Sequence, residues 1–256
     1  MPLPWRWRRP STSGVGLVSY GKTDPGMQRE NNEDAFAALD DIGLYLVADG
    51  VGGQPSGEIA SALAVQEVEA VIRKGLTAAT AATADLLVAG VQRANRAIIE
   101  SAATSTARLG MATTLSALLL VGGTAHVAHV GDCRIYRWHS GQGLECLTKD
   151  HTHVQTLVER GLLTVEHAAR HPSRHLLQRA LGAGSELEVD HLSERRRAGD
   201  RFLLCSDGLL RRVREEEIDA TLSSSSTPRD QVEQLIELTL ERGAPDNITV
   251  VVVADG

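Results

Sequence analysis

The sequence has few of the features that mark secreted, disulfide-bonded or membrane-spanning proteins. Only three cysteines occur in 256 residues, at Cys133, Cys146 and Cys205, and none forms a C-x-x-C pair. Neither a disulfide framework nor a structural zinc site is therefore predicted. No window approaches the roughly 18 apolar residues of a membrane helix, and no apolar stretch follows the basic N-terminal MPLPWRWRRP. We therefore expect neither a membrane span nor a signal peptide.

The chain also lacks the basic excess of a nucleic-acid-binding protein. It carries 33 acidic and 26 basic residues, a formal net charge of −7, and neutralising phosphates usually requires the opposite balance. Acidic clusters instead attract cations. We expect a cytoplasmic monomer in which a flexible tip, residues 1–12, precedes a single domain over residues 13–256.

Apolar segments rich in branched residues predict a series of strands, and amphipathic segments predict helices. The strands are expected at 43–48, 113–121, 124–130, 133–138, 201–206 and 248–254, and the helices at 56–74, 85–100, 152–161, 175–181 and 229–242. Gly122-Gly123 predicts a hairpin turn, and Gly131-Asp132 separates the next two strands, which suggests an antiparallel meander. Loops are expected at 75–83 and 223–228, where Thr227 or Ser226 can cap the last helix. The order of elements favours an α+β layered sandwich.

Several apolar runs end at, or begin beside, a carboxylate. The acids are Asp49 in LYLVADG, Asp132 in HVAHVGD, Asp207 in FLLCSDG, Asp246 in PDNITVVVV, and Glu33 and Asp34 in RENNEDAF. Each Asp-Gly pair taken alone is also compatible with an ordinary turn, and PDN with an ordinary loop. Strand ends at one rim of a sandwich converge, however, so the repeated pattern predicts that these acids face one another.

Converged carboxylates repel one another, and protonation or a hard cation relieves the repulsion. Ligation by oxygen alone favours Mg²⁺ or Mn²⁺, or else Ca²⁺, over zinc or copper. The glycine after an acid lets the backbone approach closely, and the Gly50 carbonyl is a further candidate ligand. Arg29 precedes these acids, and its guanidinium could hold a phosphate; the alternative is a simple salt bridge to Glu30 or Glu33. The residues thus favour a metal site, which a binuclear arrangement would fit, and leave both interpretations of Arg29 open.

Nearly the whole chain resembles the metal-dependent protein phosphatases of the PPM class, also called type 2C serine/threonine phosphatases, in their compact bacterial form. Any one Asp-Gly motif is weakly specific, but eight segments match the family in order and spacing. They are TDPGMQRENNEDAF, LVADGVGGQPSGEIAS, GMATTLSALLL, HVGDCRIYR, LTKDHTHVQTLVERGLLT, HPSRHLLQRALG, GDRFLLCSDGL and GAPDNITVVVV.

The resemblance implies a four-layer α-β-β-α sandwich of two mainly antiparallel sheets flanked by helix pairs. It also implies two or three Mn²⁺ or Mg²⁺ ions. Asp49 would bridge two metals, with the Gly50 carbonyl on one of them and Asp207 and Asp246 on the other. Asp34 would hold that second metal directly or through water, and Asp132 would bind a third metal together with Asp207. Arg29 would grip the substrate phosphate.

The implied activity is hydrolysis of phosphoserine and phosphothreonine in proteins by a metal-bridged water, which counteracts a bacterial serine/threonine kinase. The alternatives are a catalytically weak or inactive scaffold that binds phosphoproteins, and a phosphatase of an anti-sigma antagonist. No Cys-x5-Arg stretch occurs, so Cys205 is expected to be a core residue.

The chain departs from the family at three positions, where Gln54 replaces His, Ala112 replaces Gly and His175 replaces Asn. Glutamine cannot act as a general acid, so Gln54 predicts slower catalysis.

The segment 147–190 matches the mobile flap of the family. Within it His171 and Arg174 are candidate substrate contacts, while the roles of Glu33, Gln54 and Asn247 are left open. His151 with His153, and His167 with His171, have spacings seen in zinc sites but are expected to face solvent.

Overall fold

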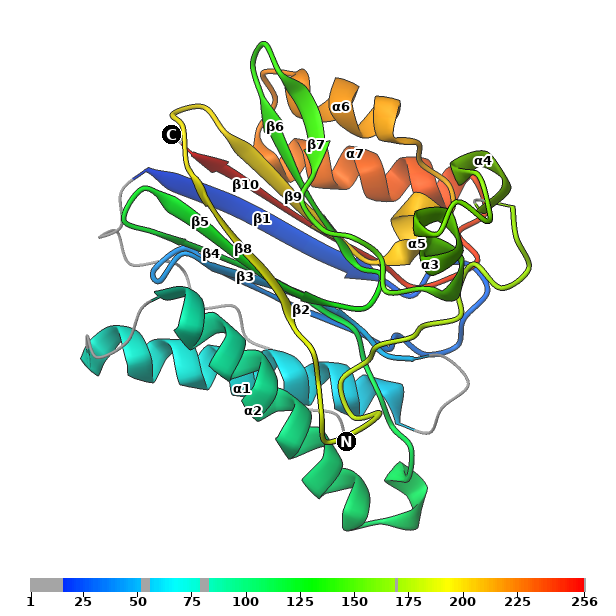
Figure 1. Ribbon diagram of the computed structural model, residues 1–256. Helices are drawn as coiled ribbons and strands as arrows, with labels where there is room; N and C mark the ends of the chain where they lie inside the picture. The colour runs from blue at the N-terminus through cyan, green and yellow to red at the C-terminus, as the bar shows by residue number, and fades with distance from the viewer. Residues whose placement is uncertain (1–15, 52–55, 79–82, 169, 256) are drawn as a thin grey trace.

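Two five-stranded antiparallel sheets form the centre of the computed structural model, which describes residues 16–51, 56–78, 83–168 and 170–255 (Figure 1). The β10 sheet has the order β1 (Leu17–Asp24), β10 (Ile248–Asp255), β9 (Arg201–Cys205), β6 (Arg134–His139) and β7 (Gly143–Cys146). The β3 sheet has the order β2 (Asp34–Leu39), β3 (Leu44–Asp49), β4 (Leu115–Val121), β5 (Thr124–Val130) and β8 (Asp190–Arg195).

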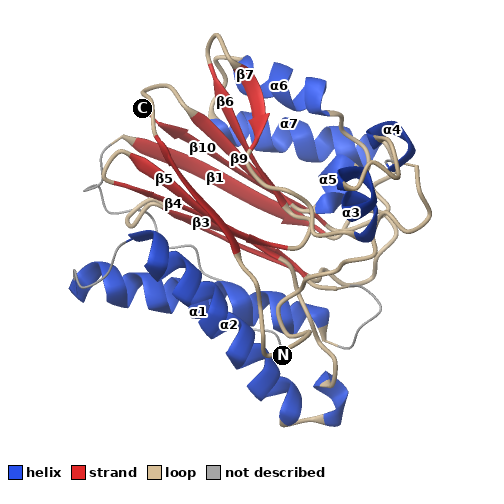
Figure 2. Cartoon of the chain, viewed as in Figure 1, coloured by secondary structure: helices blue, strands red, loops and turns tan. Residues whose placement is uncertain are grey.

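Helices cover the outer face of each sheet (Figure 2). The pair α1 (Gly57–Ala78) and α2 (Thr83–Ala103) packs on the β3 sheet, and the pair α6 (Glu215–Ser223) and α7 (Pro228–Glu241) packs on the β10 sheet. Shorter helices lie elsewhere: η1 (Thr106–Arg108), α3 (His153–Glu159), α4 (Val165–Ala168) and α5 (Asp207–Leu210). The predicted α-β-β-α sandwich of antiparallel sheets is confirmed.

The unbroken apolar runs arise because the central strands are buried on both faces. In β3, Leu44 and Leu46 pack toward α1 and α2, whereas Tyr45 and Val47 pack toward the other sheet. All four side chains are fully buried. A strand with one solvated face would alternate polar and apolar residues, but a strand between two layers has no polar face. The same arrangement accounts for the run ITVVVV in β10. Its apolar side chains point alternately toward the helices α6 and α7 and toward the other sheet.

The predicted start of the last helix is confirmed. Thr227 caps α7, because its hydroxyl accepts a hydrogen bond from the Asp230 N–H while the Asp230 carboxylate accepts from the Thr227 N–H. Pro228 occupies the first turn, where its missing N–H costs nothing.

The predicted meander is wrong at Gly131-Asp132. β5 pairs with β4 and β8, and β6 pairs with β7 and β9, so the chain passes from one sheet to the other at this turn. Gly131 has a φ of 112°, and a Cβ there would lie 2.5 Å from the Thr114 side chain. Only glycine fits this crossing, which leaves Asp132 at the rim between the two sheets.

Two other expectations also need correction. Residues 175–181 form turns and isolated bridges instead of a helix, because the N–H groups of Gln178 and Leu181 donate to His151 and Thr113 across the fold. The expected loop 75–83 is helical as far as Ala78, since alanine favours helix continuation. Four strands, β1, β2, β7 and β8, were not predicted. The predicted tip and Gln54 lie outside the described residues.

Within the described ranges no helix combines the length and the hydropathy needed to cross a bilayer.

Candidate metal centre

Five aspartates come together at one rim of the sandwich. Asp34 begins β2, Asp49 ends β3, and the two residues are direct register partners. Asp207 and Asp246 come from the other sheet, after β9 and before β10. The carboxylates of Asp49, Asp207 and Asp246 line one pocket of about 170 Å³ together with Gly50 and Asp132. The predicted convergence of strand-end acids is therefore present in the fold.

The glycines that follow two of these acids permit close backbone contact. A Cβ on Gly50 would lie 2.6 Å from the backbone of Gly57, and a Cβ on Gly208 would overlap the carbonyl oxygen of Asn247. Neither glycine has a positive φ. The Asp-Gly pairs at these two positions are therefore not the left-handed turns that the alternative interpretation requires.

Burial and mutual repulsion disfavour the charged form of three of the acids. Burial, followed by the charges of Asp34 and Asp207, raises the pKa of Asp49 well above its ordinary value. Burial and the charge of Asp207 act in the same way on the pKa of Asp132. Burial raises the pKa of Asp34 to about 7 although two hydroxyl groups oppose the shift. A cation would offset this unfavourable energy.

Asp34 is only half satisfied by its neighbours. Its Oδ2 accepts hydrogen bonds from Ser206 Oγ at 2.8 Å and from Thr249 Oγ1 at 2.6 Å. Its Oδ1 is buried and has no partner. Ser206 stands at the N-cap of α5 but makes no side-chain cap bond there. A buried carboxylate oxygen with no partner is costly and indicates a position for a cation or a cation-bound water.

Two arginines and a histidine contact Asp207 and Asp246. Arg29 Nη2 lies 2.9 Å from Asp246 Oδ1, so its ion pair is with Asp246 and not with Glu30 or Glu33. Arg211 Nη2 lies 2.7 Å from Asp207 Oδ2 and 3.0 Å from Asp246 Oδ2. His175 Nδ1 lies 3.3 Å from Asp207 Oδ2. Burial alone would raise the pKa of Asp207, but His175 and Arg211 outweigh it and leave that pKa lowered.

Arg211 was missed from the sequence, and His175 was noted only as a departure from the family. The signal for Arg211 was its position four residues after Asp207, which places both on one face of the short helix α5. Nothing in the spacing indicates the contact with Asp246, because that residue arrives from a distant segment.

The donor set fits a hard divalent cation. Among the described residues, no group of three acidic, histidine or cysteine side chains is arranged closely enough to hold a metal ion. Arg211 instead contacts oxygens of both Asp207 and Asp246. The candidate ligands nonetheless supply only oxygen atoms, which suits Mg²⁺ or Mn²⁺. The unpartnered Asp34 oxygen and the raised pKa values of three acids point the same way. The individual ligand roles stay predictions.

Asn247 and Glu33 hold the loop that carries Arg29 over the pocket. Asn247 Oδ1 accepts from the Glu33 N–H at 2.9 Å, and its amide donates to the carbonyl groups of Pro25 and Asn31. The Glu33 carbonyl in turn accepts from the Gly50 N–H at 3.1 Å. Burial raises the pKa of the Glu33 side chain. Both residues line the pocket, and the Asn247 side chain binds the backbone of this loop at three points.

A larger cleft of about 690 Å³ lies beside the carboxylate pocket, and residues of α3 and α4 line part of it. The two share the side chains of Asp132, His175, Asp207 and Arg211, and the predicted substrate contact Arg174 lines the larger cleft. The second predicted contact, His171, accepts a hydrogen bond from the Ser173 N–H.

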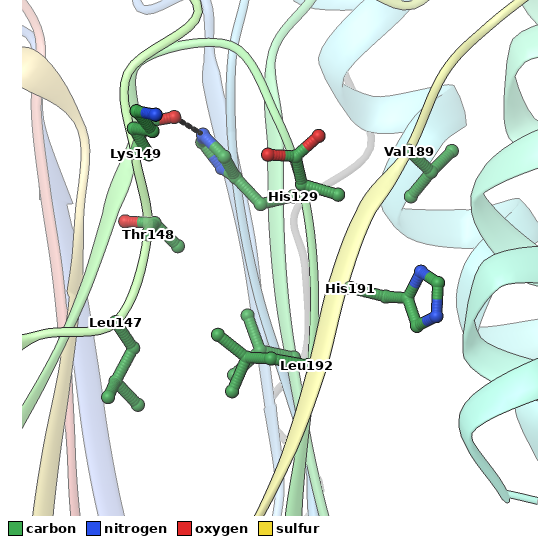
Figure 3. A pocket seen from close by; sticks show the side chains of 9 residues that line it. His129, Leu147, Thr148, Lys149, Val189, His191 and Leu192 are labelled. Carbon is green, nitrogen blue, oxygen red and sulfur yellow. Dashed lines mark hydrogen bonds between the residues drawn. The ribbon is translucent and has the colours of Figure 1, made fainter. Parts of the chain in front are cut away.

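One of the zinc-spaced histidines is buried, contrary to expectation. The His151 side chain accepts from the Gly131 N–H at 3.1 Å, and its ring centroid lies 4.8 Å from that of His129. His129 Nε2 lies 3.1 Å from the Lys149 carbonyl oxygen, and a dashed line marks this contact in Figure 3. The pocket in that view, about 340 Å³, shares no lining residue with the carboxylate pocket. The histidine pair therefore links the flap segment to the turn that carries Asp132.

Cys205 is fully buried in the cluster between the β10 sheet and α7, and burial raises the pKa of its thiol. A buried, protonated thiol is a poor nucleophile. The prediction that Cys205 is a core residue is confirmed.

Comparisons with known proteins agree with this geometry. Residues 27–247 match the family model described as protein phosphatase 2C. A Mycobacterium tuberculosis protein, serine/threonine protein phosphatase PstP, is 40% identical over 231 residues, which are 90% of this chain but 43% of the relative. The chain thus spans less than half of that relative.

Relatives of similar length and solved structures also match. The Listeria monocytogenes serine/threonine phosphatase stp is 34% identical over 236 residues, 91% of this chain and 93% of the relative. A solved structure of the PstP catalytic domain in complex with two manganese ions is 37% identical, with a TM-score of 0.82 over 93% of this chain and 97% of that one.

Proposed function

The chain belongs to the protein phosphatase 2C family, and we propose that it is a metal-dependent protein phosphatase that hydrolyses phosphoserine and phosphothreonine. The observation that carries the proposal is the rim where aspartates from both sheets meet, with Arg29 at the mouth of the pocket. Mn²⁺ in the related PstP catalytic domain supports the choice of cation.

We assign the acids of the pocket to two or three Mn²⁺ or Mg²⁺ ions. Asp49 would lie between two ions, with the Gly50 carbonyl on one side and Asp207, Asp246 and Asp34 on the other. Asp132 would join Asp207 at a third position. Such ions, when bound, polarise the phosphoryl group and lower the pKa of a bound water so that hydroxide is available at neutral pH.

Arg29 is the residue best placed to bind the substrate phosphate. Its side chain is 42% exposed and already lies against an acid of the pocket, and a guanidinium can hold two phosphate oxygens at once. The contacts from Asn247 to the loop of Arg29 would fix the position of this side chain. With buried thiols at Cys133 and Cys205, a covalent cysteine intermediate is not part of the proposed reaction.

The substrates would be phosphorylated proteins, and a bacterial serine/threonine kinase would supply them. The larger cleft beside the carboxylates has room for the polypeptide around the phosphorylated residue, and Arg174 would contact it there. A phosphorylated anti-sigma antagonist is a narrower possibility within the same chemistry. We propose a cytoplasmic monomer.

Hydrolysis of a phosphothreonine peptide and of p-nitrophenyl phosphate tests the proposal. Rates should be measured with Mn²⁺, with Mg²⁺ and with chelator, for the native chain and for Asp207→Asn. Metal-dependent turnover that the variant loses by at least about a hundredfold supports the phosphatase. A folded native chain that binds phosphopeptide but shows no turnover with either cation would favour the inactive scaffold, and would point to Gln54 in place of a general acid.

A further inference from the structure

Arg211 occupies a position that the proposed reaction does not use. Its guanidinium lies among the carboxylates that are proposed to bind metal, where Nη2 contacts Asp207 Oδ2 at 2.7 Å and Asp246 Oδ2 at 3.0 Å. Its Nε lies 3.2 Å from both oxygens of Asp207. One side chain of the protein therefore bridges two carboxylates in the way that a metal ion would.

The chain's own donors engage every oxygen of these two acids. Asp246 Oδ1 accepts from the Asn247 N–H and from Arg29, and Asp246 Oδ2 is shared by Arg29 and Arg211. Asp207 is held by Arg211 and His175. Asp34 Oδ1, in contrast, has no partner. Asp207 and Asp246 thus already share a positive charge supplied by the chain, whereas the Asp34 carboxylate is held by two hydroxyl groups.

Arg211 is anchored at its backbone but has space for its side chain. It stands at the C-cap of α5, where its N–H donates to the Asp207 carbonyl at 3.1 Å, so its Cα is fixed relative to that ligand. The side chain lines both the carboxylate pocket and the larger cleft. Asp150 and Glu215 also line the cleft, where both already pair with Arg134. A rotamer change would therefore move the guanidinium away from Asp207 and into the cleft.

We propose that Arg211 is an internal competitor for the metal position formed by Asp207 and Asp246. A divalent cation at that position must displace the guanidinium into the larger cleft, so the residue weakens metal binding there. It would thereby make loading of this position depend on the concentration of free cation. The proposal rests on the metal site of the proposed function.

Removal of the Arg211 charge should strengthen Mn²⁺ binding but lower the stability of the metal-free protein. Arg211→Gln should tighten Mn²⁺ binding at the position formed by Asp207 and Asp246 by about tenfold, which corresponds to about 1.4 kcal/mol. In chelator the same variant should melt at a lower temperature than the native chain, because Asp207 and Asp246 lose the guanidinium that bridges them. The rise in melting temperature on adding Mn²⁺ should accordingly be larger in the variant.

Mn²⁺ titration by calorimetry, with bound and free ion counted by electron paramagnetic resonance, measures this effect. Arg212→Gln is the matched control, because it removes the same charge one residue away from an exposed side chain, and it should bind Mn²⁺ like the native chain. Arg211→Lys keeps the charge and provides a second variant if the glutamine variant does not fold. It should fall between the native chain and Arg211→Gln, since an ammonium cannot fork across two carboxylates.

The possible outcomes distinguish a failure of the Arg211 proposal from a failure of the proposed metal site. If the native chain binds Mn²⁺ and Arg211→Gln binds it with equal or lower affinity, Arg211 is not a competitor, while the metal site of the proposed function stands. If Arg211→Gln leaves Mn²⁺ affinity unchanged but weakens binding of inorganic phosphate, the residue serves the substrate, and the proposal is overturned. If the native chain binds no Mn²⁺, both the inference and the proposed function fail.

Discussion

At the scale of single residues, the aspartates at the rim differ in their hydrogen-bond and ion-pair partners. Asp207 and Asp246 are held by arginines, whereas Asp34 has one oxygen bound by two hydroxyl groups and the other without a partner. Sequence reasoning identified these acids because each stands next to an apolar run. It missed Arg211, because its bridging contact depends on a residue 35 positions away that only the fold brings near.

Arg29 provides a prediction at this scale. Arg29→Ala should lower kcat/KM for a phosphothreonine peptide by about 10- to 100-fold, because a bidentate, charge-assisted contact to the phosphate is lost. Mn²⁺ affinity should not weaken, since Arg29 is not a ligand. Steady-state kinetics together with Mn²⁺ titration measure both quantities. Arg29→Lys should recover part of the loss, and an unchanged kcat/KM in the alanine variant would remove Arg29 from the substrate site.

At the scale of elements, the buried central strands could be predicted and the outer strands could not. β3 and β10 read as continuous apolar runs because layers cover both faces. The four strands that were missed, β1, β2, β7 and β8, all lie at sheet edges. The sequences of β1, β7 and β8 mix polar and apolar residues, and the apolar run of β2 is mostly alanine, which has a low strand propensity. The crossing at Gly131 was also beyond sequence reasoning, because a hairpin and a change of sheet use the same Gly-Asp pair.

The junction between β9 and α5 offers a second prediction. Gly208→Ala should destabilise the protein by roughly 2 kcal/mol or more, because the added Cβ would overlap the Asn247 carbonyl oxygen. It should also weaken Mn²⁺ binding, since both Asp207 and Asp246 adjoin the disturbed contact. Gly184→Ala is the control, because a Cβ there meets nothing within 4 Å. Urea unfolding compares the two, and equal midpoints would show that close approach is not why Gly208 is needed.

The histidine pair at the base of the flap segment predicts a dependence on pH. Burial, followed by the charge of His151, lowers the pKa of His129 to about 4, so the folded state favours the neutral ring. The stability that this ring contributes is therefore intact above its ordinary pKa of about 6.5 and is lost as the pH falls toward 4. The loss should reach roughly 3 kcal/mol, at about 1.4 kcal/mol for each pKa unit.

Replacement of His129 isolates the contribution of this ring to the pH dependence of stability. The free energy of unfolding of His129→Gln, measured in chelator between pH 7 and pH 4, should fall less steeply with acid than that of the native chain. His191→Gln, at an exposed position on β8, should follow the native profile. Parallel profiles for native and His129→Gln would mean that His129 does not titrate on unfolding.

At the scale of the whole molecule, the proposed site joins the two sheets. Asp34 and Asp49 belong to the β3 sheet, whereas Asp207 and Asp246 adjoin strands of the β10 sheet. The apolar cluster between the sheets fixes their separation, and the rim is where charged groups of both sheets meet. The layered architecture could be predicted from sequence because the order of strands and helices restricts it. The arginine contacts within the rim could not, since they depend on side-chain positions.

Anomalous diffraction from crystals grown with Mn²⁺ tests the binuclear site most directly. Data at the manganese edge should show two strong peaks at the rim, one on either side of Asp49, with the Gly50 carbonyl near one and Asp207 and Asp246 near the other. The Arg211 side chain should then lie in the larger cleft. Absence of manganese at these carboxylates, in crystals of protein that hydrolyses phosphothreonine peptide with Mn²⁺, would contradict the proposed metal centre.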